Sequence, residues 1–184
     1  MIIESIVSTI GADGKPNFAP MGVRVSAEGK LSLEVYHSSR TYRNLKSARS
    51  CVINMTGNAL LFTRAALHAQ PPPHKKSALA AGAILEEAEE ALEFVTDAEH
   101  DMGGKSEFTG RVIGRKAGQP PELGFCRAPG AVIEALICVT RKGVLPDWEI
   151  KDQLRRSRVI VEKTGGADEQ EAMRMIDEYW SANG

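Results

Sequence analysis

Cysteine, aromatic residues and an excess of charge of one sign are all scarce in this 184-residue chain. Its three cysteines, Cys51, Cys126 and Cys138, stand far apart and no CxxC pair occurs, which argues against a disulfide framework and a structural zinc site. The 23 lysines and arginines balance the 24 aspartates and glutamates, so the chain lacks the basic field typical of nucleic-acid-binding proteins. The composition therefore predicts no metal and no nucleic-acid partner.

Long hydrophobic runs are also missing. The longest apolar stretch, at 132–139, is interrupted by Glu134 and falls short of the ~20 residues that span a bilayer. The N-terminal segment MIIESIVSTI has no basic residues of the kind that open a secretory signal. With 42% hydrophobic and 26% charged residues, the chain is expected to be globular, and the scattered thiols fit a cytoplasmic location without a membrane segment.

The first third of the chain has the pattern of a β-meander. We expect strands at 2–10, 18–25 and 31–36, the last alternating cleanly as LSLEVY, with glycine-bearing turns between them. The polar segment SSRTYRNLKSARS predicts a short helix capped by Ser38 or Ser39. A fourth strand should follow at 51–56.

The middle of the chain gives weaker signals. We expect a short helix at 58–69 and, because of its three prolines, no regular structure at 70–76. Helix or loop should precede Glu90, with a strand after it. A further strand is expected at 107–116, where Gly110 and Gly114 suit a bend or a close contact.

The last third is expected to be helical. Helices should cover 128–142, 147–165 and 168–182, with Asp147 and Asp168 as N-terminal caps and Glu171 completing a capping box. The apolar stripes of the last two helices should pack together or on the barrel. The alternative is a lid in which Trp180 stacks on a ligand.

Together these patterns predict a mainly β protein with helices (α+β), an antiparallel barrel followed by a helical segment. We expect the barrel domain to cover 1–125, with the proline-rich loop 70–76 inside it, and a C-terminal helical subdomain to cover 126–184.

The segment HSSRTYRNL carries the clearest chemical signal. Hydroxyls and guanidinium groups, with Ser38 among them, gather at the mouth of a helix, where free backbone N–H groups favour a phosphate. The alternative is a capped surface helix with two solvated arginines, and the residues do not decide between them. Hydrolase chemistry is less favoured, because Ser38 lies beside His37 in a strand-like segment and no GxSxG motif exists.

A second signal lies in NFAPMGVRV, where Pro20 stands inside an apparent strand. Proline forces a strand edge or a bulge at this position. An exposed backbone edge beside small residues suits a flat heteroaromatic ring, although a plain bulge would look the same in the sequence.

Two segments in this order, STIGADGKPNFAPMGV and LEVYHSSRTYRNLKSARSCVINM, resemble the FMN-binding split-barrel (flavin reductase-like) superfamily. With the later FCRAPGAVIEALICVTR, the chain more closely resembles the archaeal and bacterial family called domain of unknown function 447. The resemblance implies a six-stranded Greek-key split barrel that forms a homodimer, with FMN at the subunit interface.

The resemblance also implies roles for individual residues. Ser39, Arg40, Thr41 and Asn44 would hold the phosphate and ribityl end, Asn17, Phe18, Ala19, Pro20, Met21 and Gly22 would line the isoalloxazine ring, and Asn54 would lie near the ring or the ribityl chain. Arg24, on the ring-lining strand, is a candidate for a positive charge near the flavin, or else a solvated arginine. No catalytic residue follows, and neither Cys126 nor Arg127 receives a role.

Three functions stay open at this stage. The first is an FMN-dependent oxidoreductase of the flavin reductase type, working with a small-molecule electron donor or acceptor. The second is a flavin-binding carrier or accessory protein without turnover, such as one in one-carbon metabolism. The third is a split barrel that binds another cofactor, such as haem or a deazaflavin.

Overall fold

The computed structural model describes residues 2–26, 29–67, 70–118 and 127–183. The chain forms two compact units, one of Met1–Thr56 with Pro71–Pro120 and the other of Gly57–Gln70 with Pro121–Gly184. The first unit contains the barrel strands and the second contains most of the helices. The segment Gly57–Gln70, which lies inside the range expected for the barrel domain, thus groups with the C-terminal helices.

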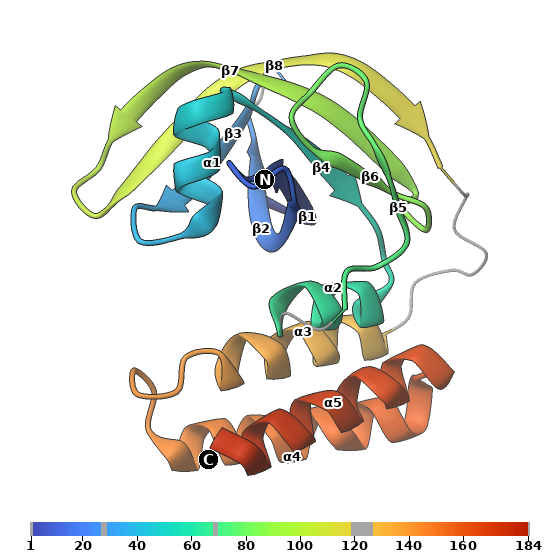
Figure 1. Cartoon of the computed structure of the whole chain (residues 1–184). Helices are drawn as coiled ribbons and strands as arrows, with labels where there is room; N and C mark the ends of the chain where they lie inside the picture. Colours follow the sequence, from blue (N-terminus) through green and yellow to red (C-terminus); the bar gives the residue numbers. More distant parts are fainter. Residues whose placement is uncertain (1, 27–28, 68–69, 119–126, 184) are drawn as a thin grey trace. The chain divides into compact units, whose positions relative to one another are not determined.

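Six strands of the described residues close into an antiparallel barrel (Figure 1). They are β1 (Ile2–Ile10), β2 (Pro16–Val25), β3 (Leu31–Tyr36), β4 (Ser50–Met55), β7 (Glu90–Asp101) and β8 (Lys105–Ala117). Their order around the barrel is β1-β2-β3-β8-β7-β4, and β4 pairs back to β1. The predicted meander and the split-barrel fold with C-terminal helices are confirmed.

The barrel opens along part of β2. This strand pairs with β1 from Pro16 to Arg24 but with β3 only through Val23–Val25. Among the described residues, the stretch 16–22 therefore has no strand partner on its second side. Pro20 lies in this stretch, where proline is tolerated, so the predicted strand edge is confirmed.

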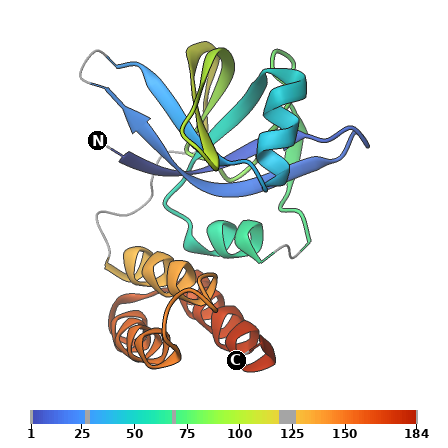
Figure 2. The ribbon, with the colours of Figure 1, turned by 90° about the vertical axis from the view of Figure 1, so that its left-hand side faces the viewer.

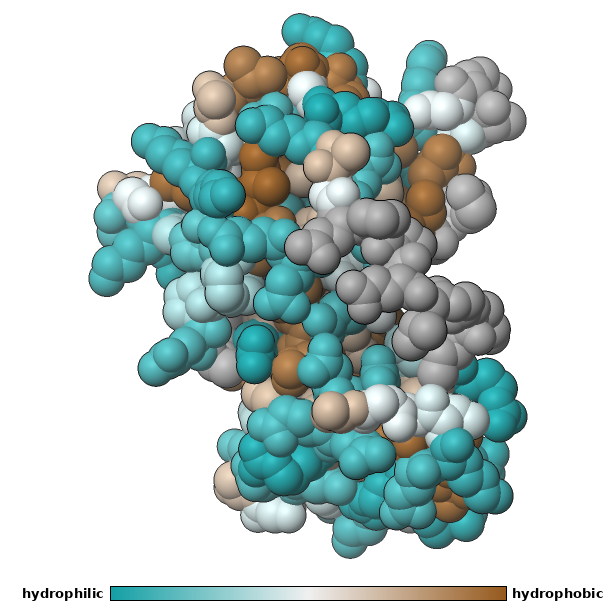
Figure 3. Space-filling model, turned by 90° about the vertical axis from the view of Figure 1, so that its right-hand side faces the viewer, coloured by the Kyte–Doolittle hydropathy of each residue, from teal (hydrophilic) through white to brown (hydrophobic). Residues whose placement is uncertain are grey.

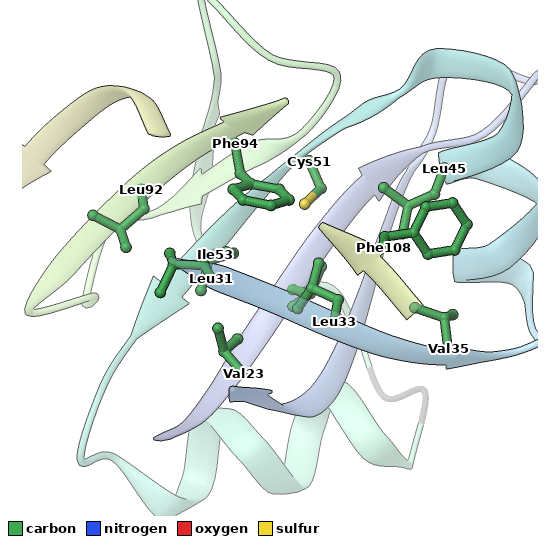
Figure 4. Packing of buried hydrophobic residues seen from close by; sticks show 11 residues of the cluster. Val23, Leu31, Leu33, Val35, Leu45, Cys51, Ile53, Leu92, Phe94 and Phe108 are labelled. Carbon is green, nitrogen blue, oxygen red and sulfur yellow. The ribbon is translucent and has the colours of Figure 1, made fainter. Parts of the chain in front are cut away.

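Helix α1 (Arg40–Ala48) follows β3 and contacts β1, β2, β3 and β4. Figures 1 and 2 both show it lying against these strands. Its Leu45 is fully buried and belongs to the same apolar cluster as Phe108 of β8, next to which it is drawn in Figure 4. Burying a side chain of this size stabilises the fold by about 1.5–3 kcal/mol, so α1 is part of the barrel core.

The interior of the barrel is tightly packed. Leu33, Ile53 and Phe94 are fully buried there (Figure 4). A Cβ at Gly110 would lie 2.0 Å from the Val95 carbonyl oxygen and 2.8 Å from Phe94 Cζ. Both distances are shorter than van der Waals contact, so only glycine fits at this position. The prediction that this strand uses glycine for a close contact is confirmed.

A small hairpin of β5 (His74–Lys76) and β6 (Ala83–Leu85) covers the outer face of β1 and β4. The Ser8 hydroxyl donates to the Ala83 carbonyl at 2.6 Å, and the Asn54 amide oxygen accepts from the Leu85 N–H at 2.9 Å. The expectation of no regular structure at 70–76 is wrong for its last three residues, because pairing with β6 orders them as β5. The expected loop before Glu90 is present as bends and β6, and those residues form no helix.

The described residues of the second unit form α2 (Ala59–Ala66), α3 (Arg127–Val139), α4 (Asp147–Thr164) and α5 (Ala167–Asn183). Helix α3 contacts the other three, and α5 also contacts α2 and α4. The buried faces include Ile150, Leu154 and Val161 of α4 and Ile176 of α5, so the predicted packing of the stripes is confirmed. None of the helices in the described ranges is long and apolar enough to cross a membrane.

The predicted caps of the last two helices are wrong in detail. The N-cap of α4 is Pro146, and Asp147 is its first helical residue. At the start of α5, Glu169 accepts from the Gly166 N–H at 2.8 Å, the task expected of Glu171. A cap at Asp147 or Asp168 would start the helix one residue later, so α4 begins one position and α5 two positions earlier than predicted.

Candidate functional site

The turn between β3 and α1 contains backbone N–H donors that are not all hydrogen-bonded. Ser39 is the N-cap of α1, and its Oγ accepts from the Tyr42 N–H at 3.1 Å. Within the described residues, the N–H groups of Arg40 and Thr41 have no hydrogen-bond acceptor. Two free amides, the positive end of the helix dipole and two serine hydroxyls make this turn suited to an anion.

Arg40 lies over the β1–β2 turn. Its Nη2 donates to both carboxylate oxygens of Asp13, at 3.1 and 3.2 Å. A Cβ at Gly11 would lie 2.9 Å from Nη2, so glycine gives the guanidinium its room. The Lys15 N–H, with the Arg40 and Lys15 charges, holds the pKa of Asp13 below its ordinary value. The guanidinium is half-exposed and available to a second anion.

Two amide side chains of the predicted site, those of Asn17 and Asn44, attach α1 to the barrel strands. Asn17 of β2 donates to Thr41 Oγ1 at 3.1 Å, and the buried Asn44 donates to Thr9 Oγ1 at 2.9 Å. These two bonds tie α1 to β2 and to β1. Thr41 and Asn44 are also more than nine-tenths buried. Their bonds and burial hold the start of α1 in place.

Asn54 of β4 is fully buried. Its amide donates to the carbonyls of Ile6 and Ala83, at 3.1 and 3.2 Å, and its oxygen accepts from Leu85. All of its bonds go to backbone groups of β1 and β6. The amide therefore joins the hairpin to the barrel. The predicted contact of Asn54 with a ligand stays a prediction.

The open stretch of β2 offers one face to the barrel and one to the outside. Met21 and Val23 pack on the barrel core. Phe18, three residues before Met21 and on the opposite face of the strand, meets the ring of His74 at 5.2 Å between centroids. Ala19, Pro20 and Met21 are half-buried and Gly22 is exposed. Among the described residues, no strand pairs with the second backbone edge of this stretch.

The other residues considered in the sequence analysis have structural partners or are buried. Arg24 pairs with Glu34, with Nη2 and Oε1 2.9 Å apart. The His37 ring bonds Ser106 at 2.9 Å rather than Ser38 or Ser39, which removes the base from the serine pair. Burial raises the pKa of Cys51 to about 12, so its thiol stays neutral. Cys126 lies outside the described residues.

Two neighbours of the site carry no signal in the sequence. Asp13 looks like a turn residue, and only the barrel register brings it to Arg40. His74 follows three prolines in an apparent linker, and only the β5–β6 pairing brings it to Phe18. Their positions depend on contacts between distant segments, which local patterns do not report.

A groove of about 830 Å³ lies elsewhere, between α4 and α5. Its charged rim is already paired: Arg158 and Asp177 approach to 2.6 Å, and Arg174 bonds Glu178. None of the predicted site residues lines it. Among the described residues, no cluster of histidine, cysteine or acidic side chains is placed to hold a metal ion.

Two family models match consecutive parts of the chain. Residues 3–119 match the family described as protein of unknown function (DUF447) N-terminal domain, and residues 126–178 match protein of unknown function (DUF447). An FMN-bound DUF447 protein from Methanosarcina mazei is 22% identical, with a TM-score of 0.85 over 97% of this chain and 94% of that chain.

Two further solved structures share the barrel. An NADH:FAD oxidoreductase from Streptomyces globisporus is 12% identical, with a TM-score of 0.56 over 63% of this chain and 70% of that chain. An FMN-binding protein from Thermus thermophilus, with bound p-hydroxybenzaldehyde, is 20% identical, with a TM-score of 0.55 over 65% of this chain and 72% of that chain. At these identities the similarity shows a common fold.

Proposed function

Since this chain belongs to the DUF447 family, in which the Methanosarcina mazei protein is FMN-bound, we propose that it binds FMN on its barrel. The phosphate would lie at the N-terminus of α1, and the isoalloxazine ring along the open stretch of β2. The observation that carries this proposal is the bond between Asn17 and Thr41, which joins the ring-lining strand to the anion-binding turn.

The residues present fit such a ligand. A phosphate needs several donors that converge without an opposing buried charge, and the free amides of Arg40 and Thr41, the serine hydroxyls and the Arg40 guanidinium supply them. A flavin ring needs an apolar surface with backbone groups at its edge, which the stretch 17–22 provides. Thr41 and Asn44, bonded to β2 and β1, and Asn54, bonded to the β5–β6 hairpin, would support these groups from behind.

FMN, when bound, supplies one- and two-electron transfer chemistry. The chain would contribute binding and orientation. Helix α1 would hold the phosphate and so set the position of the whole cofactor. The β2 edge would set the plane of the ring, with Phe18 and His74 packed behind it. Among the described residues, no two side chains beside this edge form a pair that could act as general acid and base.

We further propose an oxidoreductase of the flavin reductase type, in keeping with relatives such as the NADH:FAD oxidoreductase. The experiment is to purify the chain, identify its released cofactor, and follow NADH and NADPH oxidation at increasing FMN. Turnover that saturates with FMN supports the enzyme. Stoichiometric FMN binding without turnover supports a flavin carrier, and a released haem or deazaflavin contradicts FMN.

Assembly is part of the proposal. The barrel unit exposes the large apolar side chains Tyr36, Leu79, Met102 and Ile113. Figure 3 shows hydrophobic groups, in brown, between the polar side chains of one face of the molecule. We propose a cytoplasmic homodimer that shields part of this surface and completes the flavin site, with the barrel and the C-terminal helices as its two domains. Light scattering should give about twice the chain mass of 19.9 kDa.

Replacing Asp13 by asparagine is expected to strengthen FMN binding by about twofold to fivefold, the range of an exposed ion pair. The substitution frees Arg40 and removes a negative charge 3.1 Å from it. Fluorescence titration of wild type and Asp13→Asn measures the change. The matched control is Asp97→Asn, which removes an exposed ion pair with Arg111 and should leave FMN affinity unchanged. Weaker FMN binding by Asp13→Asn would contradict a phosphate at Arg40.

A further inference from the structure

Both ends of the β3–α1 turn are tied to one carboxylate, that of Glu99 on β7. After the turn, the Tyr42 hydroxyl donates to Glu99 Oε1 at 3.1 Å, and Lys46 Nζ donates to Oε2 at 2.7 Å. Before the turn, His37 bonds Ser106, and Ser106 Oγ donates to Glu99 Oε1 at 3.0 Å. The residues between these two attachments are Ser38, Ser39, Arg40 and Thr41.

The direction of each bond in this cluster is determined. An ionised carboxylate only accepts, so the Ser106 hydroxyl gives its hydrogen to Glu99. The Ser106 oxygen then accepts from His37 Nε2, 2.9 Å away, which places the proton of a neutral His37 on Nε2. Lys46, with the Ser106 and Tyr42 hydroxyls, holds the pKa of Glu99 below its ordinary value. The carboxylate therefore keeps all three donors at neutral pH.

Packing and backbone bonds make the cluster a rigid support. Ser106 is fully buried, and the His37 and Tyr42 rings lie 4.6 Å apart between centroids. The His37 N–H donates to the Gly104 carbonyl at the tip of the β7–β8 hairpin, at 3.0 Å. A helix N-terminus binds an anion well only when its amides are already oriented, because ordering them on binding costs free energy.

We propose that Glu99 is a positioning residue for the phosphate-binding turn: through Ser106 and His37 on one side and Tyr42 on the other, it holds Ser38–Thr41 in the conformation that receives the FMN phosphate. This inference rests on the proposed function. A merely structural Glu99 would affect the whole barrel and every ligand alike. A positioning Glu99 affects the phosphate, and therefore separates FMN from riboflavin, which has the same ring and ribityl chain without the phosphate.

The experiment compares FMN and riboflavin affinities of wild type, Glu99→Gln and Tyr42→Phe by fluorescence titration. We expect Glu99→Gln to weaken FMN about tenfold, and Tyr42→Phe, which keeps the ring and loses one hydroxyl, about threefold. Riboflavin affinity should change less than about twofold, within the effect of a remote surface substitution. The matched control is Glu90→Gln on the same strand, which loses an ion pair with Arg115 and should change neither affinity.

The outcomes separate this inference from the proposed function. Wild type that binds FMN no better than riboflavin overturns the phosphate site itself, and this inference with it. Wild type that prefers FMN, with variants that lose both flavins equally or neither, overturns the positioning role alone. Should Glu99→Gln fail to fold, as seen by circular dichroism, Tyr42→Phe decides by the same criteria.

Discussion

Replacing Arg40 by alanine is expected to weaken FMN binding by about tenfold to a hundredfold, because one hydrogen bond to a charged group contributes about 1.5–3 kcal/mol. The guanidinium lies at the start of α1, beside the free amides of Arg40 and Thr41. Its loss also leaves Asp13 without its cation, so a negative charge faces the phosphate unopposed. Both effects act in the same direction. Fluorescence titration with FMN and with riboflavin measures them.

The control for this variant is Arg115→Ala. Arg115 is also an exposed arginine with one carboxylate partner, Glu90 at 2.8 Å, but it lies on β8 away from the turn. It should leave the affinity for FMN unchanged. Riboflavin should bind Arg40→Ala and wild type alike. An Arg40→Ala protein that is folded and binds FMN as tightly as wild type would rule out the phosphate assignment.

Replacing Ile176 by alanine should lower the free energy of unfolding of the helical unit by about 2–5 kcal/mol, the usual cost of removing a fully buried aliphatic side chain. Ile176 is fully buried on α5, which contacts α2, α3 and α4. Denaturant unfolding followed by circular dichroism measures the loss. The FMN affinity of the folded protein should not change, since the proposed site is built from barrel residues.

Two further variants sharpen this test. Val159→Ala changes an α4 side chain that is 42% exposed, and its effect should stay within about 0.5 kcal/mol. Trp180→Ala examines the lid alternative, because a ring that stacks on flavin would be needed for binding. In the structure, Trp180 is half-buried in the helical unit with Lys142 Nζ 5.7 Å from its ring centroid. Loss of FMN affinity in Trp180→Ala without loss of stability would favour the lid.

The fold was accessible from the sequence wherever one local period dominates. The alternation of LSLEVY and the capped helix at Ser39 both reappear in the structure, as β3 and α1. The hairpin of β5 and β6 was not accessible, because three prolines signal a break and the pairing of His74 with Leu85 depends on tertiary contacts. Its anchors, Ser8 and Asn54, lie on strands that are distant in sequence.

The candidate site could be predicted in outline. Pro20 in a strand indicated the open edge, and HSSRT indicated the anion-binding turn. The partners of these residues could not be predicted. Asp13 and Glu99 reach the site through the pairing of the barrel strands, and His74 through the β5–β6 hairpin, whose sequence does not look like a strand. The motif places Thr41 and Asn44 among the ligand-binding residues, and in the structure their side chains bond Asn17 of β2 and Thr9 of β1.

The most direct test of the central claim is a crystal structure of the chain with FMN. The proposal predicts the phosphate within hydrogen-bond distance of the Arg40 and Thr41 amides, and the isoalloxazine ring against the β2 stretch 17–22. A phosphate held in the groove between α4 and α5, or a ring that does not touch β2, would contradict it.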